Sequence, residues 1–226
     1  MYDILFIGKN DSDFNKLKDR FPTAKRIPIS TDIYSALMLA SNRSFTKMFW
    51  VVWDNLLVRE DFNFDYVQDH WQRPKHYIFY AKNMVNDLTY GHMGIVLYNT
   101  RMVINAPAFG EFGTDYTLSF EHQVVPIVSC YGSFNSNAYH TWRTAFREVH
   151  KLCEYADTKN CIETKHRINT WLNKAHGDYS EWCLRGARDG KEFYENYKDD
   201  VEYRRNTFRW EWLQNYFNSL HGKFNE

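Results

Sequence analysis

The sequence predicts an α/β fold in which helices flank a mixed sheet and a helical region follows at the C-terminal end. The first quarter of the chain alternates short apolar runs with segments of helical periodicity, which is typical of parallel strands joined by helices. Residues 48–53 are continuously apolar or aromatic, as expected for a strand buried on both faces. No proline follows Pro126, and apolar residues then recur every three or four positions.

The first 55 residues are expected to form strand, helix, strand, helix and strand in that order. The strands are predicted at residues 4–7, 24–29 and 48–53, and the helices at residues 11–21 and 33–41. In open α/β sheets, ligands bind outside the carboxyl ends of the strands. The residues that follow these strands are therefore the first place to look for a functional site.

The middle of the chain is expected to add strands without regular helical connections. Apolar runs occupy residues 76–80, 94–98 and 124–128, and polar segments with Gly and Asn separate them. This pattern favours a mixed sheet. We assign residues 1–138 to one α/β region on these grounds.

Residues 139–226 are expected to form a helical region packed on the first. Its helical segments are predicted from Tyr139 onward, at 167–174, at 179–188 and at 201–220. The glycines at 186 and 190 predict a flexible joint, because glycine weakens a helix. No internal repeat and no low-complexity linker interrupts this part of the chain.

Composition and charge exclude several classes of protein. The 28 Lys and Arg residues balance 28 Asp and Glu residues, so no protein-wide basic field attracts nucleic acid, although a local basic face is allowed. Four widely spaced cysteines do not fit a zinc site. There is no signal-peptide pattern, and no apolar stretch reaches the roughly 18 residues that span a bilayer. We therefore expect a cytoplasmic protein without a membrane partner.

Asp54 and Asn55 form the main candidate site, because they follow the buried strand at residues 48–53 directly. A carboxylate at this position can hold a divalent metal ion, which in turn can hold a diphosphate. Gly8 closes the first strand and is a further candidate. The alternative is a turn that ends the strand, since both Asp and Asn favour turns.

Two further segments offer candidate residues before residue 120. Tyr90 and Gly91 lie in a segment that is expected to be a glycine-containing loop leading into a strand, where the backbone can approach a ligand or only turn. Asp115 stands between a glycine and hydroxyl side chains. It is a candidate general base for an acceptor hydroxyl, or it caps a turn.

Arginines provide the candidate sites of the helical region. Arg143 and Arg147 are four residues apart and share one helix face, so they can bind a diphosphate or pair with Glu148 and Glu154. A second set alternates with aromatic residues, as in a helix that contacts nucleic acid or in an amphipathic helix that buries its rings. This second set consists of Arg204, Arg205 and Arg209.

Three segments together resemble small glycosyltransferase-like proteins of tailed phages, which belong to the GT-A type of glycosyltransferase. They are residues 49–55, 86–94 and 141–148, and the resemblance extends over about residues 1–190. The resemblance implies a GT-A-like, Rossmann-like sheet. In the family an Asp-x-Asp motif follows the equivalent strand, whereas this chain has a single carboxylate there, Asp54, and has Met93 where a second glycine is expected.

The resemblance also implies an enzyme that moves a sugar from a nucleotide-sugar, here a UDP-sugar, to an acceptor hydroxyl. The acceptor implied is hydroxymethylated cytosine in double-stranded phage DNA, and the location is the cytoplasm of an infected bacterium. Asp54 would hold Mn²⁺ or Mg²⁺, or the two arginines would replace the ion. The alternative is a non-catalytic binding protein on a degenerate GT-A scaffold. The residues implied are Asp115 as base and, for the donor, Gly8, Asp54, Asn55, Tyr90, Gly91, Arg143 and Arg147.

Overall fold

The structure is a computed structural model, and it forms two compact units. It describes residues 1–28, 30–54, 56–68, 73–106, 117, 120–133, 135–159 and 161–223. Among these, the first unit holds the described residues of 1–82, 89–106 and 117–132, and the second holds those of 83–88 and 133–223. The first unit is built on a sheet, and the second is mainly helical.

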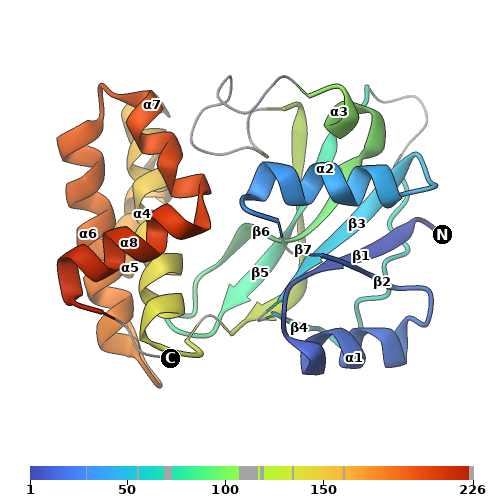
Figure 1. Cartoon of the computed structure of the whole chain (residues 1–226), viewed down its shortest axis with the longest axis horizontal. Coiled ribbons are helices and arrows are strands. Elements are labelled where there is room, and N and C mark those ends of the chain that lie inside the picture. Colours follow the sequence, from blue (N-terminus) through green and yellow to red (C-terminus); the bar gives the residue numbers. More distant parts are fainter. Residues whose placement is uncertain are drawn as a thin grey trace. The chain divides into compact units, whose positions relative to one another are not determined.

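The first unit contains one mixed sheet with the strand order β2-β1-β3-β6-β5-β7-β4, flanked by helices (Figure 1). The predicted α/β class is therefore confirmed. The elements are β1 (Asp3–Ile7), α1 (Asp11–Arg20), β2 (Lys25–Ile27), α2 (Ile33–Arg43), β3 (Met48–Trp53), β4 (Leu56–Val58), β5 (His76–Asn83), β6 (Thr89–Asn99), α3 (Thr100–Ile104) and β7 (His122–Gly132).

The first three strands are parallel and end together. β1 pairs with β2 on one side and with β3 on the other, and Ile7 lies opposite both Ile27 and Trp53. Every residue of β3 before Trp53 is buried, and β3 lies inside the sheet between β1 and β6. The prediction of a doubly buried strand is confirmed, and the carboxyl ends of β1 and β3 lie side by side.

Polar residues fix where the first two helices begin. The side chain of Asn10 accepts a hydrogen bond from the N–H of Asp13 at the start of α1 (3.2 Å). The side chain of Asp32 does the same for Ser35 at the start of α2 (2.7 Å). Each cap satisfies a backbone donor that has no partner inside its helix. The loop between β1 and α1 therefore ends at the Asn10 cap.

β6 is longer than the sequence predicts. It pairs in antiparallel fashion with β3 and with β5, and it begins at Thr89 rather than at Gly94. The expected loop before Gly94 is therefore wrong for residues 89–93. Its pairing with β5 shifts register between Ile78 and Tyr80. Such an irregularity is invisible in the sequence, because it depends on a partner strand.

The chain between β4 and β5 is anchored by Arg20 at the end of α1. The Arg20 guanidinium donates hydrogen bonds to four backbone carbonyls at 2.9–3.1 Å. Those carbonyls belong to Val58, Arg59, Glu60 and Phe62. Phe62 and Phe64 then insert into the core, where both rings pack edge-on against Trp50. This segment is thus held by charge-assisted hydrogen bonds and by aromatic packing.

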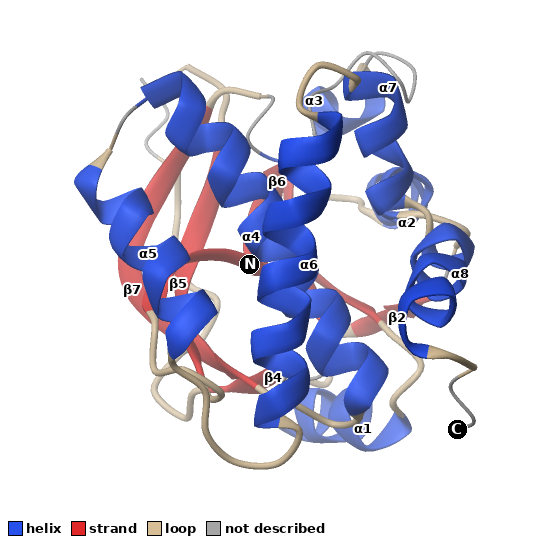
Figure 2. Cartoon of the chain, turned by 90° about the vertical axis from the view of Figure 1, so that its left-hand side faces the viewer, coloured by secondary structure: helices blue, strands red, loops and turns tan. Residues whose placement is uncertain are grey.

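The second unit is mainly helical (Figure 2). Its helices pack around aromatic side chains. Its core contains Tyr139, Trp142, Phe146 and Phe193 together with two residues of the last helix, Leu213 and Phe217. The elements are α4 (Ala138–Lys159), α5 (Ile162–Asn173), α6 (Ser180–Tyr197), α7 (Val201–Arg204), a 3₁₀ helix (Arg205–Phe208) and α8 (Trp210–His221). The predicted helical C-terminal region is confirmed.

Gly186 and Gly190 form a tight helix contact, not a flexible joint. Both lie inside α6, on the side that packs against α4. A Cβ atom at Gly186 would lie 2.3 Å from the carbonyl oxygen of Trp142, and one at Gly190 would lie 2.3 Å from that of Phe146. The predicted joint is therefore wrong. Glycine stands here because the two helix backbones approach too closely for any side chain.

Candidate functional site

Gly8 and Asp54 meet at the carboxyl ends of β1 and β3, and we call this place the β1–β3 edge. The backbone N–H of Asp54 donates to the carbonyl of Ile7 (3.1 Å), which extends the pairing of the two strands by one residue. The N–H of Lys9 donates to Oδ2 of Asp54 (3.1 Å). A Cβ atom at Gly8 would lie 2.4 Å from Cβ of Asp54. Two of the candidate donor-binding residues, Gly8 and Asp54, therefore lie in contact.

Arg26 supports the β1–β3 edge from the neighbouring strand β2. Its Nε donates to the carbonyl of Gly8 (3.1 Å), and its Nη1 pairs with the carboxylate of Asp11. The guanidinium also lies over the rings of Phe6 and Phe14, at 5.8 and 5.4 Å from their centroids. Nη2 is buried and has no hydrogen-bond partner among the described residues. Arg26 therefore holds the loop that presents the N–H of Lys9 to Asp54.

Tyr90 and Gly91 lie inside β6, where the sequence predicts a ligand-facing loop. Tyr90 is buried and pairs with Ala81 of β5, and Gly91 pairs with Tyr80. A Cβ atom at Gly91 would lie 2.8 Å from a methyl group of Val124. The expectation of a loop at these residues is wrong, because the glycine relieves crowding within the sheet and the tyrosine belongs to the core.

Arg143 and Arg147 lie on α4 in the second unit and flank one indole ring. Their guanidinium carbons are 5.7 and 5.9 Å from the ring centroid of Trp210 on α8. Arg143 also lies 5.7 Å from the ring of Tyr139. Cation–π contacts of this kind fix the last helix on α4. The two predicted diphosphate ligands thus contribute to packing in the second unit.

The acids suggested as their partners have other contacts. Glu148 pairs with Lys151 (2.8 Å) and Glu154 pairs with Arg204 (2.8 Å). These pairs belong to the same unit. The first pair lies within α4, and the second joins α4 to α7.

The arginines of residues 204–209 do not form a row along one helix face. Arg204 is buried and pairs with Glu154, and Arg205 pairs with Glu202. Arg209 lies between the 3₁₀ helix and α8 and contacts the side chain of Asn206 (3.3 Å). The aromatic side chains that alternate with them pack against the core of the unit. The amphipathic alternative is therefore confirmed for the aromatic side chains, and contact with nucleic acid stays a prediction.

Two of the predicted site residues, Asn55 and Asp115, lie outside the described residues. Their roles stay predictions. Asp54 remains as the carboxylate of the β1–β3 edge.

The described residues do not make the β1–β3 edge a good metal site. They contain no group of three or more His, Cys, Asp or Glu side chains that could hold a metal ion. Asp54 brings one carboxylate, and one of its oxygens already accepts a hydrogen bond from the N–H of Lys9. Arg26 donates to the carbonyl of Gly8, which lies next to Asp54. The Asp54 carboxylate can accept a hydrogen bond from a hydroxyl group, and by itself it supplies too few oxygen ligands for a divalent cation.

Sequence reasoning missed Lys9 and Arg26. A signal for Lys9 exists, because it follows Gly8 in the loop between the first strand and the first helix. Arg26 is opposite Phe6 in the parallel register of β1 and β2. Side chains of residues paired in this way point to the same face of a sheet. The register, which the sequence does not reveal, is what brings this cation to the loop.

A comparison of the sequence with protein-family models and with curated proteins gives no match. Among the residues described, no helix is both long and apolar enough to cross a membrane.

Proposed function

We propose that the protein is a glycosyltransferase that binds a nucleotide-sugar at the β1–β3 edge and moves the sugar to an acceptor hydroxyl. The β1–α1–β2–α2–β3 order and the carboxylate at the end of β3 support this proposal, because they are the features on which the GT-A resemblance depends. The single observation that carries it is the contact between Gly8, Lys9 and Asp54 at the ends of two parallel strands.

Each residue of the edge has a chemical task in this proposal. The hydrogen bond from the N–H of Lys9 orients Asp54, whose carboxylate then accepts a hydrogen bond from a hydroxyl group of the donor. The ammonium group of Lys9 supplies positive charge toward the diphosphate, which is the leaving group of the transfer. Arg26 keeps the loop in place through the carbonyl of Gly8.

The donor class and the acceptor follow the resemblance. A UDP-sugar is the donor that we propose, and hydroxymethylated cytosine in double-stranded DNA is the acceptor. The test is run with and without Mn²⁺ or Mg²⁺. Asp115 stays the predicted base, since it lies outside the described residues.

The test measures nucleotide binding and sugar transfer separately. Thermal shift and calorimetry with UDP-, GDP- and CDP-sugars, with and without Mn²⁺, should show stabilisation by one nucleotide class. Asp54→Asn keeps the size of the side chain and removes its charge. It should weaken binding by about tenfold, since a hydrogen bond to a charged group contributes roughly 1.5 kcal/mol. Asp19→Asn is the matched control on the exposed surface of α1 and should change nothing.

Transfer is followed by mass spectrometry of nucleosides from DNA that contains hydroxymethylcytosine. A hexose or pentose mass on that base, lost in Asp54→Asn, supports the enzyme. Stabilisation by no nucleotide contradicts the proposal.

A non-catalytic binding protein on the same scaffold is the second candidate, and the single carboxylate at the β1–β3 edge favours it. It predicts nucleotide binding without transfer to any acceptor or to water. Release of free UDP from a UDP-sugar would exclude it.

A further inference from the structure

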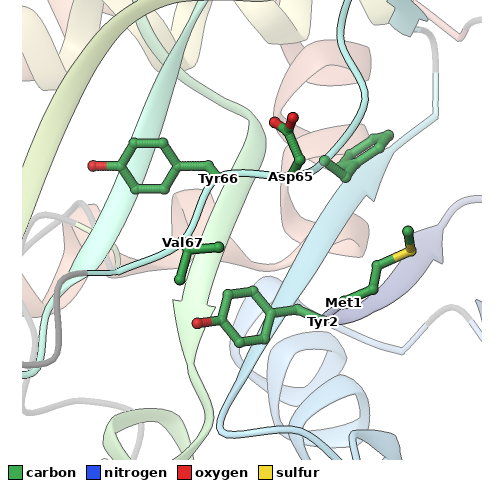
Figure 3. A pocket seen from close by; sticks show the side chains of 6 residues that line it. Met1, Tyr2, Asp65, Tyr66 and Val67 are labelled. Atoms are coloured by element: carbon green, nitrogen blue, oxygen red, sulfur yellow. The ribbon is translucent and has the colours of Figure 1, made fainter.

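A hollow lies at the other end of β1, next to Met1 and Tyr2 (Figure 3). Its volume is about 370 Å³, within the usual range of small-ligand sites. The lining residues are Met1, Tyr2, Phe64, Asp65, Tyr66 and Val67. Five residues of β1 separate it from Gly8, which is a distance of about 16 Å along an extended strand. The hollow is therefore distinct from the β1–β3 edge.

Aromatic packing fixes part of the wall of the hollow. Phe64 adopts a positive φ of 57°, a conformation that bulky residues rarely take, and its ring is buried against Phe21 and Trp50. Tyr66 packs against Tyr77, with ring centroids 5.0 Å apart. These two aromatic residues are therefore positioned before a ligand binds, which lowers the entropy cost of binding.

The residues that line the hollow favour a ligand that is a neutral ring carrying hydroxyl groups at its edge. Figure 3 shows the rings of Tyr2 and Tyr66 nearly face-on, on either side of Val67, with both hydroxyl groups pointing the same way. Val67 is 65% exposed, so apolar surface lies open between the two rings. Asp65 adds a carboxylate. No Lys or Arg is among the described residues that line the hollow, which disfavours an anion.

We propose that this hollow binds a short neutral oligosaccharide. The C–H faces of the sugar rings lie on Tyr2 and Tyr66, and the hydroxyl groups at the sugar border bond to the phenol groups and to Asp65. An organic cation also binds against aromatic rings, and it is the competing ligand in the test. A nucleobase also stacks on aromatic rings, but its phosphates need basic partners.

The test titrates the full chain with maltotriose, cellotriose and chitotriose in the absence of any nucleotide, followed by saturation-transfer NMR and calorimetry. We expect saturable binding of at least one trisaccharide in the millimolar range. Tyr2→Ala and Asp65→Asn should each weaken it by about fivefold or more. Tyr155→Ala, which removes a half-exposed tyrosine of the second unit, is the matched control and should leave binding unchanged.

The result is independent of sugar transfer. Asp54→Asn should leave trisaccharide binding intact, so failure of one proposal does not remove the other. Asp65→Asn alters an exposed side chain and keeps the test valid if Tyr2→Ala lowers stability. The proposal is overturned if no trisaccharide binds, or if both variants bind as the unaltered chain does. Displacement of the trisaccharide by tetramethylammonium or by a single-stranded oligonucleotide at lower concentration would assign the hollow to those ligands instead.

Discussion

The two units both contain glycines at close contacts, but the contacts differ in kind. In the first unit, Gly8 contacts the side chain of Asp54, which a substitution can remove. In the second unit, Gly186 and Gly190 meet the carbonyl oxygens of Trp142 and Phe146, which no substitution removes. The first kind of contact shapes a candidate site, and the second fixes the distance between two helices. The structural role of a glycine therefore depends on which atoms lie next to it.

The units use arginine in the same two ways. In the first unit, Arg26 donates to the carbonyl of Gly8 and lies over the ring of Phe6. In the second unit, Arg143 lies over the ring of Trp210, and Arg204 donates to a backbone carbonyl. The same residue type thus positions backbone and supports aromatic packing in both units.

The largest effect is expected for Gly186→Ala. Alanine normally stabilises a helix by about 1 kcal/mol relative to glycine. Here the added Cβ must push α4 and α6 apart, so we expect a net loss of about 2 kcal/mol in the free energy of unfolding. Urea denaturation measures it. Arg188→Ala, on the exposed side of the same helix, should stay within about 0.5 kcal/mol. A Gly186→Ala protein as stable as the unaltered chain would show that the helices can separate freely.

A smaller effect is expected for Gly8→Ala, because the clash there is with a side chain. We expect a loss of about 1–2 kcal/mol. Replacing Asp54 by glycine as well removes the clashing Cβ and Cγ atoms, so the double variant should lose less than the sum of the two single variants. The measurement is a double-mutant cycle by urea denaturation. Strictly additive losses would mean that the two residues do not touch.

The smallest effect is expected when either of two buried histidines, one in each unit, is replaced by leucine. Burial lowers the pKa of both His76 and His150 to about 3, with a smaller contribution from His122 to the first and from Arg204 to the second. The unfolded chain binds these protons near pH 6.5, so stability is full above that pH and falls as the pH drops from about 6.5 toward about 3. Replacing either histidine by leucine should flatten this part of the stability curve.

At pH 7 the two leucine variants should differ in sign. Nδ1 of His76 accepts a hydrogen bond from the N–H of Asn99 (3.1 Å), so His76→Leu should lose about 1 kcal/mol. Neither ring nitrogen of His150 has a hydrogen-bond partner among the described residues, so His150→Leu should gain about 1 kcal/mol. Urea denaturation from pH 4 to pH 8 measures both. Equal effects at pH 7 would mean that an acceptor reaches His150 in solution.

Much of the fold could be predicted because its signals are local. The apolar run of β3 and the helical spacing of Trp142 and Phe146 depend only on neighbours in the chain. The position of Asp54 could be predicted for the same reason, since it follows the strand directly. The start of β6 at Thr89 could not, because its polar residues become a strand only when β5 lies beside them.

The sequence alone determined the α/β class, the three parallel strands, the helical C-terminal region and the position of Asp54 directly after the third strand. Periodicity and the order of elements suffice for these, since each is set within a few residues or by the right-handed connection of parallel strands. Only the tertiary structure decided that Arg26 holds the β1–α1 loop, that Gly186 and Gly190 pack tightly, and that Tyr2 and Tyr66 border one hollow. Each of these depends on side chains far apart in the sequence, and register and packing alone bring such side chains together.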